Sequence, residues 1–238
     1  MKRIYICLIL SILAAPGPLY GQAAQFLTVP TDARTLSLGS TGVVASADAF
    51  SIYNNNSAVT FSDFKAALAA SYTMWQPGTS GSNLANLSGF FKMGKRGAFL
   101  LGSRFSLYSP YDMTNDQGSS TGTYRPMEIS FDLGYAFKIS ESFSAGVTLR
   151  YVLSKIGPDA SGGAFAADLG LTYNKRNVSI GLSATNLGSK INYGYGPYTL
   201  PAQIRLGAGY KFHIGEKHLL SVAAQTGYLI NNSGITAC

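Results

Sequence analysis

Residues 127–139 alternate without a break between apolar side chains and polar or small ones. The odd positions are Met, Ile, Phe, Leu, Tyr, Phe and Ile, and the even positions are Glu, Ser, Asp, Gly, Ala and Lys. A period of two is typical of a strand with one apolar and one polar face. An ordinary strand is about 5–6 residues long, whereas a tilted strand needs about 9–11 to cross a bilayer. This stretch is therefore long enough to span a membrane.

The same pattern recurs from residue 65 onward. Nine strands are predicted, at about 66–75, 84–93, 97–109, 127–139, 143–155, 164–174, 178–186, 202–212 and 218–230. Alternation alone fits a water-soluble sandwich as well as a membrane barrel, because the two differ in what covers the apolar face.

The connections between these strands favour the barrel. Short ones at 94–96, 140–142, 175–177 and 213–217 take turns with longer ones at 76–83, 110–126, 156–163 and 187–201. Tight periplasmic turns alternating with longer outer loops are typical of outer-membrane barrels. The prediction is an all-β fold, an antiparallel transmembrane β-barrel over residues 65–238, with outer-membrane lipids against its apolar face.

Composition supports an all-β membrane protein and argues against a nucleic-acid-binding protein. The charged fraction of 12% is about half the roughly 25% of ordinary globular chains. The 27 glycines, 15 tyrosines and 13 phenylalanines fit an all-β protein with many turns and much aromatic surface. The basic residues are dispersed and form no stripe of the kind that nucleic acid requires. A nucleic-acid partner is therefore not expected.

Residues 1–23 have the features of a cleaved secretory signal. Lys2 and Arg3 precede a short apolar core at 4–15, and small residues follow it. The core falls short of the about 20 apolar residues of a spanning helix. Export to the outer membrane of a Gram-negative cell is therefore expected.

The far end of the chain is expected to be truncated. Nine strands are an odd number, whereas bacterial single-chain barrels have an even one. The sequence also ends within residues 231–238, where a long outer loop is expected to begin. Further strands are therefore expected beyond Cys238.

Residues 24–64 differ from the rest, because they are rich in small and polar residues and lack clean alternation. They are too polar to form a core of their own and are expected to pack against the barrel or inside it. Residues 26–34 (FLTVPTDAR) and 38–53 (LGSTGVVASADAFSIY) resemble the PorV/PorQ family of type IX secretion system outer-membrane proteins, which are related in fold to the FadL transporters. ATNLG at 184–188 and LPAQIRLG at 200–207 resemble two later motifs of that family.

The resemblance carries several implications. Residues 24–64 would form a plug or hatch in a barrel of about fourteen strands, a count within the bacterial range. The hatch residues singled out are Phe26, Leu27, Asp32, Arg34, Phe50 and Asn55. Where the family continues into Trp-Asn-Pro, this chain has Asn54, Asn55 and Asn56, so only the middle position agrees. The implied role is to assist protein secretion or surface attachment, with secretion-system components and cargo proteins as partners.

Catalytic chemistry is not predicted. The chain shows no Ser-His-Asp set, no metal-ligand spacing and no phosphate loop, and His213 and His218 fall in or beside a short turn. The expectation is a protein that is not an enzyme, with neither a cofactor nor a metal.

The charged residues of the polar faces are the candidate site. If the apolar faces meet lipid, six of these residues point into the lumen: Arg104, Glu128, Asp132, Arg150, Asp168 and Arg205. Folding 127–139 onto 143–155 about Glu141 sets Asp132 opposite Arg150, and opposite charges facing across a strand pair are favourable. Such a pair would stiffen the lumen; alternatively it would anchor the hatch through Asp32 or Arg34.

Three functions remain open from the sequence. The first is a secretion-system interaction protein, which a blocked lumen would favour. The second is a FadL-like transporter of hydrophobic small molecules, which an apolar pocket lined by Phe26, Leu27 and Phe50 would favour. The third is a purely structural barrel.

Overall fold

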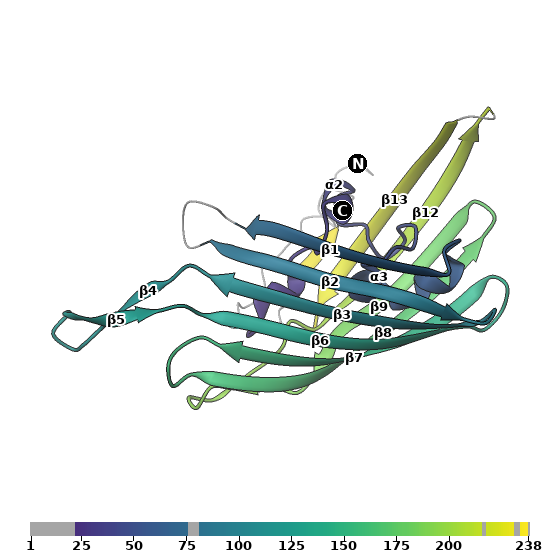
Figure 1. Cartoon of the computed structure of the whole chain (residues 1–238). Helices are drawn as coiled ribbons and strands as arrows, with labels where there is room; N and C mark the ends of the chain where they lie inside the picture. The colour runs from purple at the N-terminus through teal and green to yellow at the C-terminus, as the bar shows by residue number, and fades with distance from the viewer. Residues whose placement is uncertain (1–21, 76–80, 216–217, 231–233, 238) are drawn as a thin grey trace, which may run out of the picture.

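The computed structural model of the chain describes residues 22–75, 81–215, 218–230 and 234–237. The predicted signal at 1–23 lies almost wholly outside these residues. One curved antiparallel sheet makes the wall of the molecule, and the N-terminal segment (residues 24–64) lies within the curve of that wall (Figure 1). None of the helices in the described ranges has the length and apolar character needed to cross a membrane.

The wall has ten strands in the order β1-β2-β3-β6-β7-β8-β9-β12-β13-β14. Their bounds are β1 Ala66–Trp75, β2 Ser82–Met93, β3 Gly97–Tyr108, β6 Met127–Lys138, β7 Phe143–Lys155, β8 Ser161–Lys175, β9 Val178–Gly188, β12 Gln203–Ile214, β13 His218–Leu229 and β14 Gly234–Ala237. The nine predicted strands are all present, with their ends shifted by up to three residues. The antiparallel fold class predicted from alternation is confirmed.

Several segments that the sequence predicts as loops contain strands. The predicted loop 110–126 holds a hairpin of β4 Tyr111–Thr114 and β5 Ser120–Tyr124, which projects beyond the wall (Figure 1). The loop 187–201 holds the short pair β10 Ile191–Asn192 and β11 Pro197–Tyr198. The expectation of a long loop after residue 231 is wrong, because β14 returns to pair with the end of β13. Short apolar–polar runs of two to five residues carry too weak a pattern to predict such pairs.

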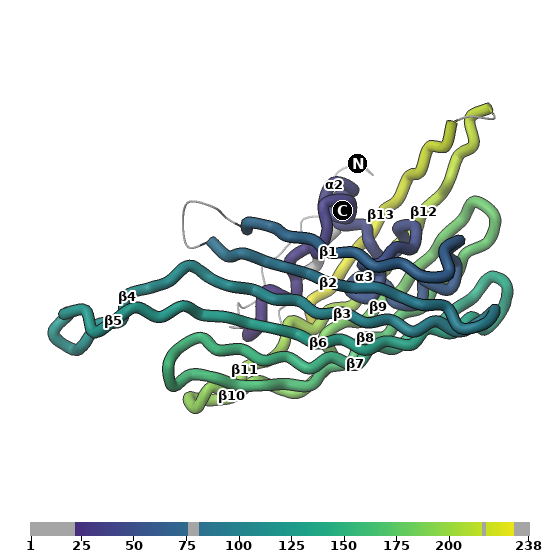
Figure 2. Tube along the Cα trace, viewed as in Figure 1, coloured from purple at the N-terminus to yellow at the C-terminus, as the bar shows by residue number. Residues whose placement is uncertain are grey.

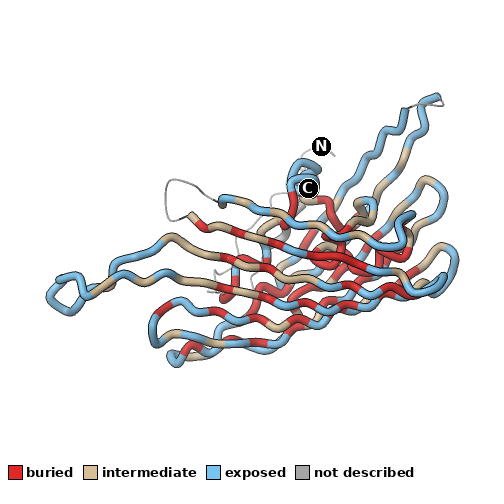
Figure 3. Tube along the Cα trace, in the orientation of Figure 1, coloured by how far each residue is buried: buried red, intermediate tan, exposed pale blue. Residues whose placement is uncertain are grey.

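Burial along the wall is the reverse of that in a water-soluble protein. On the outer face of β6 and β7, Phe131, Leu133 and Leu149 are 53%, 54% and 62% exposed. On the inner face Ser130, Asp132 and Thr148 are buried, and buried residues alternate with more exposed ones along most of β6 and β8 (Figure 3). An apolar outside around a polar inside is the arrangement of a transmembrane barrel.

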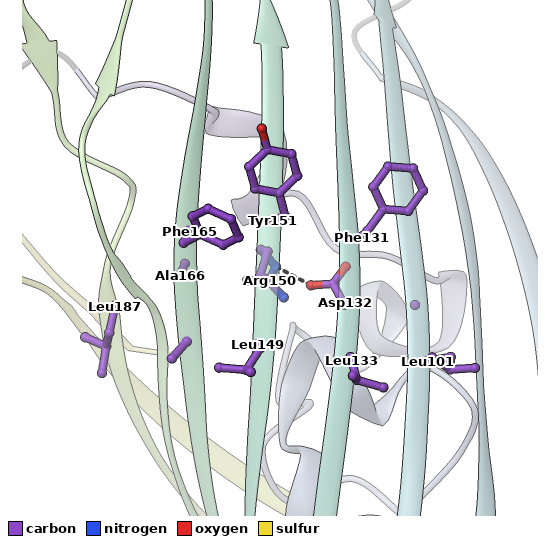
Figure 4. A pocket seen from close by; sticks show the side chains of 12 residues that line it. Leu101, Phe131, Asp132, Leu133, Leu149, Arg150, Tyr151, Phe165, Ala166 and Leu187 are labelled. Atoms are coloured by element: carbon purple, nitrogen blue, oxygen red, sulfur yellow. Dashed lines mark hydrogen bonds and ion pairs between the residues drawn. The ribbon is translucent and has the colours of Figure 1, made fainter.

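The outer face also carries an apolar groove of about 670 Å³. Its lining includes Leu101, Phe131, Leu133, Leu149, Tyr151 and Phe165, several of which stand out from the wall in Figure 4. A large contiguous patch of exposed apolar side chains is rare on soluble monomers. It is the surface expected against lipid acyl chains.

Four short helices make up the N-terminal segment: η1 Gln25–Thr28, α2 Ala33–Ser37, α3 Ser51–Asn54 and η2 Asn56–Phe61. The trace of this segment runs between the two sides of the curved sheet (Figure 2). Two apolar clusters fasten it to the wall. One joins Phe26 and Leu27 to strands β2, β7 and β8, and the other joins Ile52 and Val59 to β2, β3 and β6.

Candidate functional site

An ionic triad crosses three neighbouring strands of the inner face. The strand register sets Asp132 on β6 directly opposite Arg150 on β7. The Nε of Arg150 contacts Oδ1 of Asp132, as Figure 4 shows. The Nη2 of Arg150 also lies 2.9 Å from Oδ2 of Asp168 on β8. All three side chains are buried, so one guanidinium serves two carboxylates and the sequence-predicted pair is part of a triad.

Asn186 completes the triad from the next strand. Asp168 sits at an irregularity in the pairing of β8 with β9, where the register shifts between Ala167 and Leu169. Opposite it, Asn186 has a φ of 59°, a left-handed conformation that asparagine tolerates better than most residues. Its backbone N–H donates to Asp168 Oδ1 at 2.7 Å, and its Oδ1 accepts from Arg150 Nη1. The bulge therefore turns Asn186 of the ATNLG motif toward the ion cluster.

Asn186 also links the two later sequence motifs. Its Nδ2 donates to the carbonyl oxygen of Pro201 at 3.0 Å. Pro201 belongs to the LPAQIRLG motif, which also contains Arg205. The sequence signal for Asn186 was its place in the ATNLG motif, but the inward direction of its side chain depends on the bulge.

Arg104 holds the end of the first helix of the N-terminal segment. From β3 its guanidinium donates to the carbonyl oxygens of Leu27, Phe26 and Val29 at 2.8, 2.6 and 2.7 Å. These carbonyls lie at and just beyond the C-terminus of η1, where helical carbonyls lack partners within the helix. A cation there is also favoured by the helix dipole. Arg104 is 2% exposed, so these contacts are shielded from water.

Arg205 does the same for a second helix. From β12 its Nη2 donates to the carbonyl oxygens of Tyr53 and Asn54, at 3.2 and 3.0 Å. Both carbonyls belong to the last turn of α3. Two arginines of the wall thus hold the C-terminal carbonyls of two short helices, which fixes the segment at both positions.

Asn55 and Asn56 bind the N-terminal segment to the inner face of the wall. Asn55 Nδ2 donates to Thr172 Oγ1 at 3.0 Å, and Asn56 Nδ2 donates to Thr148 Oγ1 at 2.8 Å. Asn55 also accepts from the N–H of Ser57, so it caps η2 as well. Asn56 stands where the resembled family has proline, and its side chain makes a contact that proline could not. Sequence reasoning singled out Asn55 and missed Asn56.

A glycine of the wall makes this contact possible. A Cβ at Gly170 would collide with the side-chain oxygens of both Asn55 and Asn56. We expect Gly170→Ala to push η2 off the wall at a cost of about 1–3 kcal/mol, the usual penalty of overpacking. Faster hydrogen exchange in residues 51–61 would report the displacement.

Gly209→Ala is the matched control for that substitution. Gly209 lies on β12, and the nearest atom to a Cβ there would be the Val222 carbonyl oxygen at 3.6 Å, an ordinary contact. Its exchange rates should equal those of the parent. Equal rates in Gly170→Ala would contradict the proposed close packing.

Asp32 and Arg34 do not reach the ion triad, so the expectation that they anchor the segment to Asp132 and Arg150 is wrong. Asp32 Oδ1 accepts from the N–H of Thr35 at 2.7 Å and caps α2. Arg34 Nη1 lies 3.0 Å from Asp48 Oδ2, also within the segment. Burial, and then the Asp32 carboxylate, raise the pKa of Asp48, and Arg34 offsets part of that rise. Both side chains are therefore satisfied by partners close in sequence, Asp32 by capping α2 and Arg34 by pairing with Asp48.

The remaining predicted residues lie in separate places. Phe26 and Leu27 belong to one apolar cluster and Phe50 to the other. The structure therefore does not bring the three together around one pocket. Glu128 is buried on β6, where it accepts from Ser154 Oγ at 2.7 Å and from the hydroxyl of Tyr108. It contacts neither the triad nor the N-terminal segment through these bonds.

The chemistry of this inner face is that of attachment. Arg104 and Arg205 bind backbone carbonyls of the N-terminal segment, and Asn55 and Asn56 of that segment bind threonines of the wall. In the parts of the chain that the structure describes, no group of three or more His, Cys, Asp or Glu side chains is placed to hold a metal ion.

Comparison with known proteins gives a family and similar solved structures. The family described as "Type IX secretion system protein PorV" matches residues 19–233. The toluene transporter TodX of Pseudomonas putida is a similar solved structure, with 12% sequence identity, a TM-score of 0.48, and coverage of 79% of this chain and 69% of that one. The comparison with curated proteins finds no match.

Proposed function

We propose, from the premise that the chain belongs to the type IX secretion system protein PorV family, that it holds a fixed hatch within an outer-membrane barrel. It contacts secreted proteins at the end of the barrel that carries the longer connections. The family match over residues 19–233 is the observation that carries the secretion role. It makes the chain an outer-membrane protein of that system and agrees with the resemblance seen in four sequence motifs. The leader at 1–23 is proposed to direct export and to be removed.

The contacts of the N-terminal segment support a hatch that stays in place. Buried hydrogen bonds or apolar packing join the segment to β2, β3, β6, β7, β8 and β12. Arg104 and Arg205 bind the ends of η1 and α3, and Asn55 and Asn56 bind η2 to the wall. A segment fixed at so many points favours a closed interior over a gated channel. We therefore favour secretion over transport of hydrophobic small molecules.

The end of the wall with the longer connections is the proposed meeting place for cargo. The β4–β5 hairpin projects from this end (Figure 1). It has two short strands with exposed residues and stands clear of the wall. Long loops face outward in outer-membrane barrels, so this hairpin is placed to contact secreted proteins.

A pull-down from outer membranes tests the proposal. The affinity-tagged chain is expected to capture secretion-system components or their cargo. Replacing residues 112–123 by an Asn-Gly turn, which suits a two-residue hairpin, should reduce cargo capture while the folded fraction of the barrel stays the same. Capture of neither cargo nor secretion components by the parent chain would contradict the role. Undiminished capture by the shortened chain would contradict the site.

A further inference from the structure

A polar cavity of about 220 Å³ lies between the N-terminal segment and the wall. The segment contributes Leu27, Thr31 and Tyr53 to it, and the wall contributes Arg104, Arg150, Thr185 and Arg205. Pockets for organic ligands usually measure about 300–1,000 Å³, whereas one water takes about 30 Å³ of liquid volume. The size suits a small ion with a few waters and not a hydrophobic substrate.

The charge of the lining is one-sided. Three arginines line the cavity, and no Asp or Glu does so among the described residues. On the wall, the carboxylates of Asp132 and Asp168 both pair with Arg150. The carboxylate of Asp32 accepts from Thr31 and Thr35 at the edge of the cavity and, within the described ranges, pairs with none of the three arginines. Arg104 and Arg205 bind only neutral carbonyl and amide oxygens in the described part of the chain, and neither makes an ion pair there. Two arginines without an ion pair leave positive charge beside the cavity.

Such a charge is unfavourable in a shielded site unless an anion compensates it. Arginine stays protonated in proteins, so the site cannot relieve the charge by losing a proton. A buried charge without a counter-charge is costly. An anion bound by guanidinium groups gains charge-assisted hydrogen bonds, which are stronger than neutral ones.

Two unused donors on the wall point to the same ligand. The hydroxyl of Thr185, a residue 5% exposed, is buried without a hydrogen-bond partner among the described residues. The Nε–H of Arg205 is likewise buried without one. Both residues line the cavity. Buried polar atoms are rarely left without partners, and one acceptor-rich ligand would satisfy both.

We propose that this cavity binds a small oxyanion of the size of phosphate or sulfate. The Nε–H of Arg205 and the hydroxyl of Thr185 donate to its oxygens, and the positive charge of the three arginines holds it. This site is independent of the secretion role, because it depends only on the charge and hydrogen bonding of the cavity.

Isothermal titration of the purified chain with sodium sulfate and with sodium phosphate tests the site. The chain is held in dodecyl maltoside, a detergent without phosphate or sulfate groups, in a low-chloride buffer. Saturable binding of at least one anion is expected. Thr185→Val keeps the β-branched shape and both arginines, and should weaken binding about tenfold or more, as losing one hydrogen bond to a charged group does. Arg205→Gln should weaken it further.

Arg96→Gln is the matched control, because it removes the same charge from an exposed turn between β2 and β3. Its affinity should equal that of the parent. Absence of saturable binding by the parent would overturn the proposal. Equal affinities in the parent and Thr185→Val would also overturn it, and that result does not depend on whether Arg205→Gln folds.

Discussion

Replacing Arg150 by methionine is expected to lower the free energy of unfolding by about 3–5 kcal/mol, the cost of removing one partner from a buried ion pair. The substitution leaves the buried carboxylates of Asp132 on β6 and Asp168 on β8 without their shared cation. It also removes the donor to Asn186 Oδ1. Urea unfolding in detergent, followed by the fluorescence of the one tryptophan, Trp75, measures the loss.

Two further variants separate the triad from a general effect of substitution. Asp132→Ala should cost less than Arg150→Met, because Arg150 keeps Asp168 at 2.9 Å. Glu141→Gln removes the ion pair with Lys138 at 3.5 Å, where Glu141 is 96% exposed, and should leave the unfolding midpoint unchanged. A midpoint for Arg150→Met equal to that of the parent would contradict the triad's contribution.

Replacing Arg104 by methionine is expected to release the start of the N-terminal segment. The methionine fills part of the space but donates nothing to the carbonyls of Phe26, Leu27 and Val29. Hydrogen bonds to charged groups contribute about 1.5–3 kcal/mol each, so the loss of several exceeds the stability of one short helix. The barrel wall keeps its own backbone pairing and should stay folded.

Limited proteolysis measures this release. Cleavage within residues 24–40 should rise at least tenfold in Arg104→Met, while the fragment holding the wall stays intact. Arg125→Met is the control, because Arg125 donates to the backbone carbonyl of Tyr108 at the end of β3 and not to the N-terminal segment. Equal cleavage in Arg104→Met and Arg125→Met would contradict the anchoring role of Arg104.

The wall follows closely from the sequence, whereas the contacts of the segment do not. Alternation fixes which side chains of residues 127–139 share a face, and the short turn at Glu141 fixes the register that sets Asp132 opposite Arg150. Both features are local, so a single sequence carries them. The inward direction of Arg104 and Arg205 follows from the same alternation.

The partners of those arginines are backbone carbonyls, which every residue has. Side-chain identity therefore gives no signal that Arg104 meets η1 or that Arg205 meets α3. The same holds for Asn186, whose inward direction results from a bulge opposite Asp168. Asp32 and Arg34 mislead for a related reason, because capping and local pairing satisfied charges that looked free for a distant contact.

The measurement that tests the account most directly places the two faces of β6 relative to the membrane. Single cysteines at positions 131, 133 and 135, and at 130 and 136, are introduced after Cys7 and Cys238 are changed to serine. An environment-sensitive dye on each cysteine is then exposed to brominated lipids in reconstituted vesicles. We expect strong quenching at 131, 133 and 135, whose side chains are exposed on the outer face, and weak quenching at 130 and 136, which are buried inside. Equal quenching on both faces, or the reverse pattern, would contradict a barrel whose polar interior is filled by its N-terminal segment.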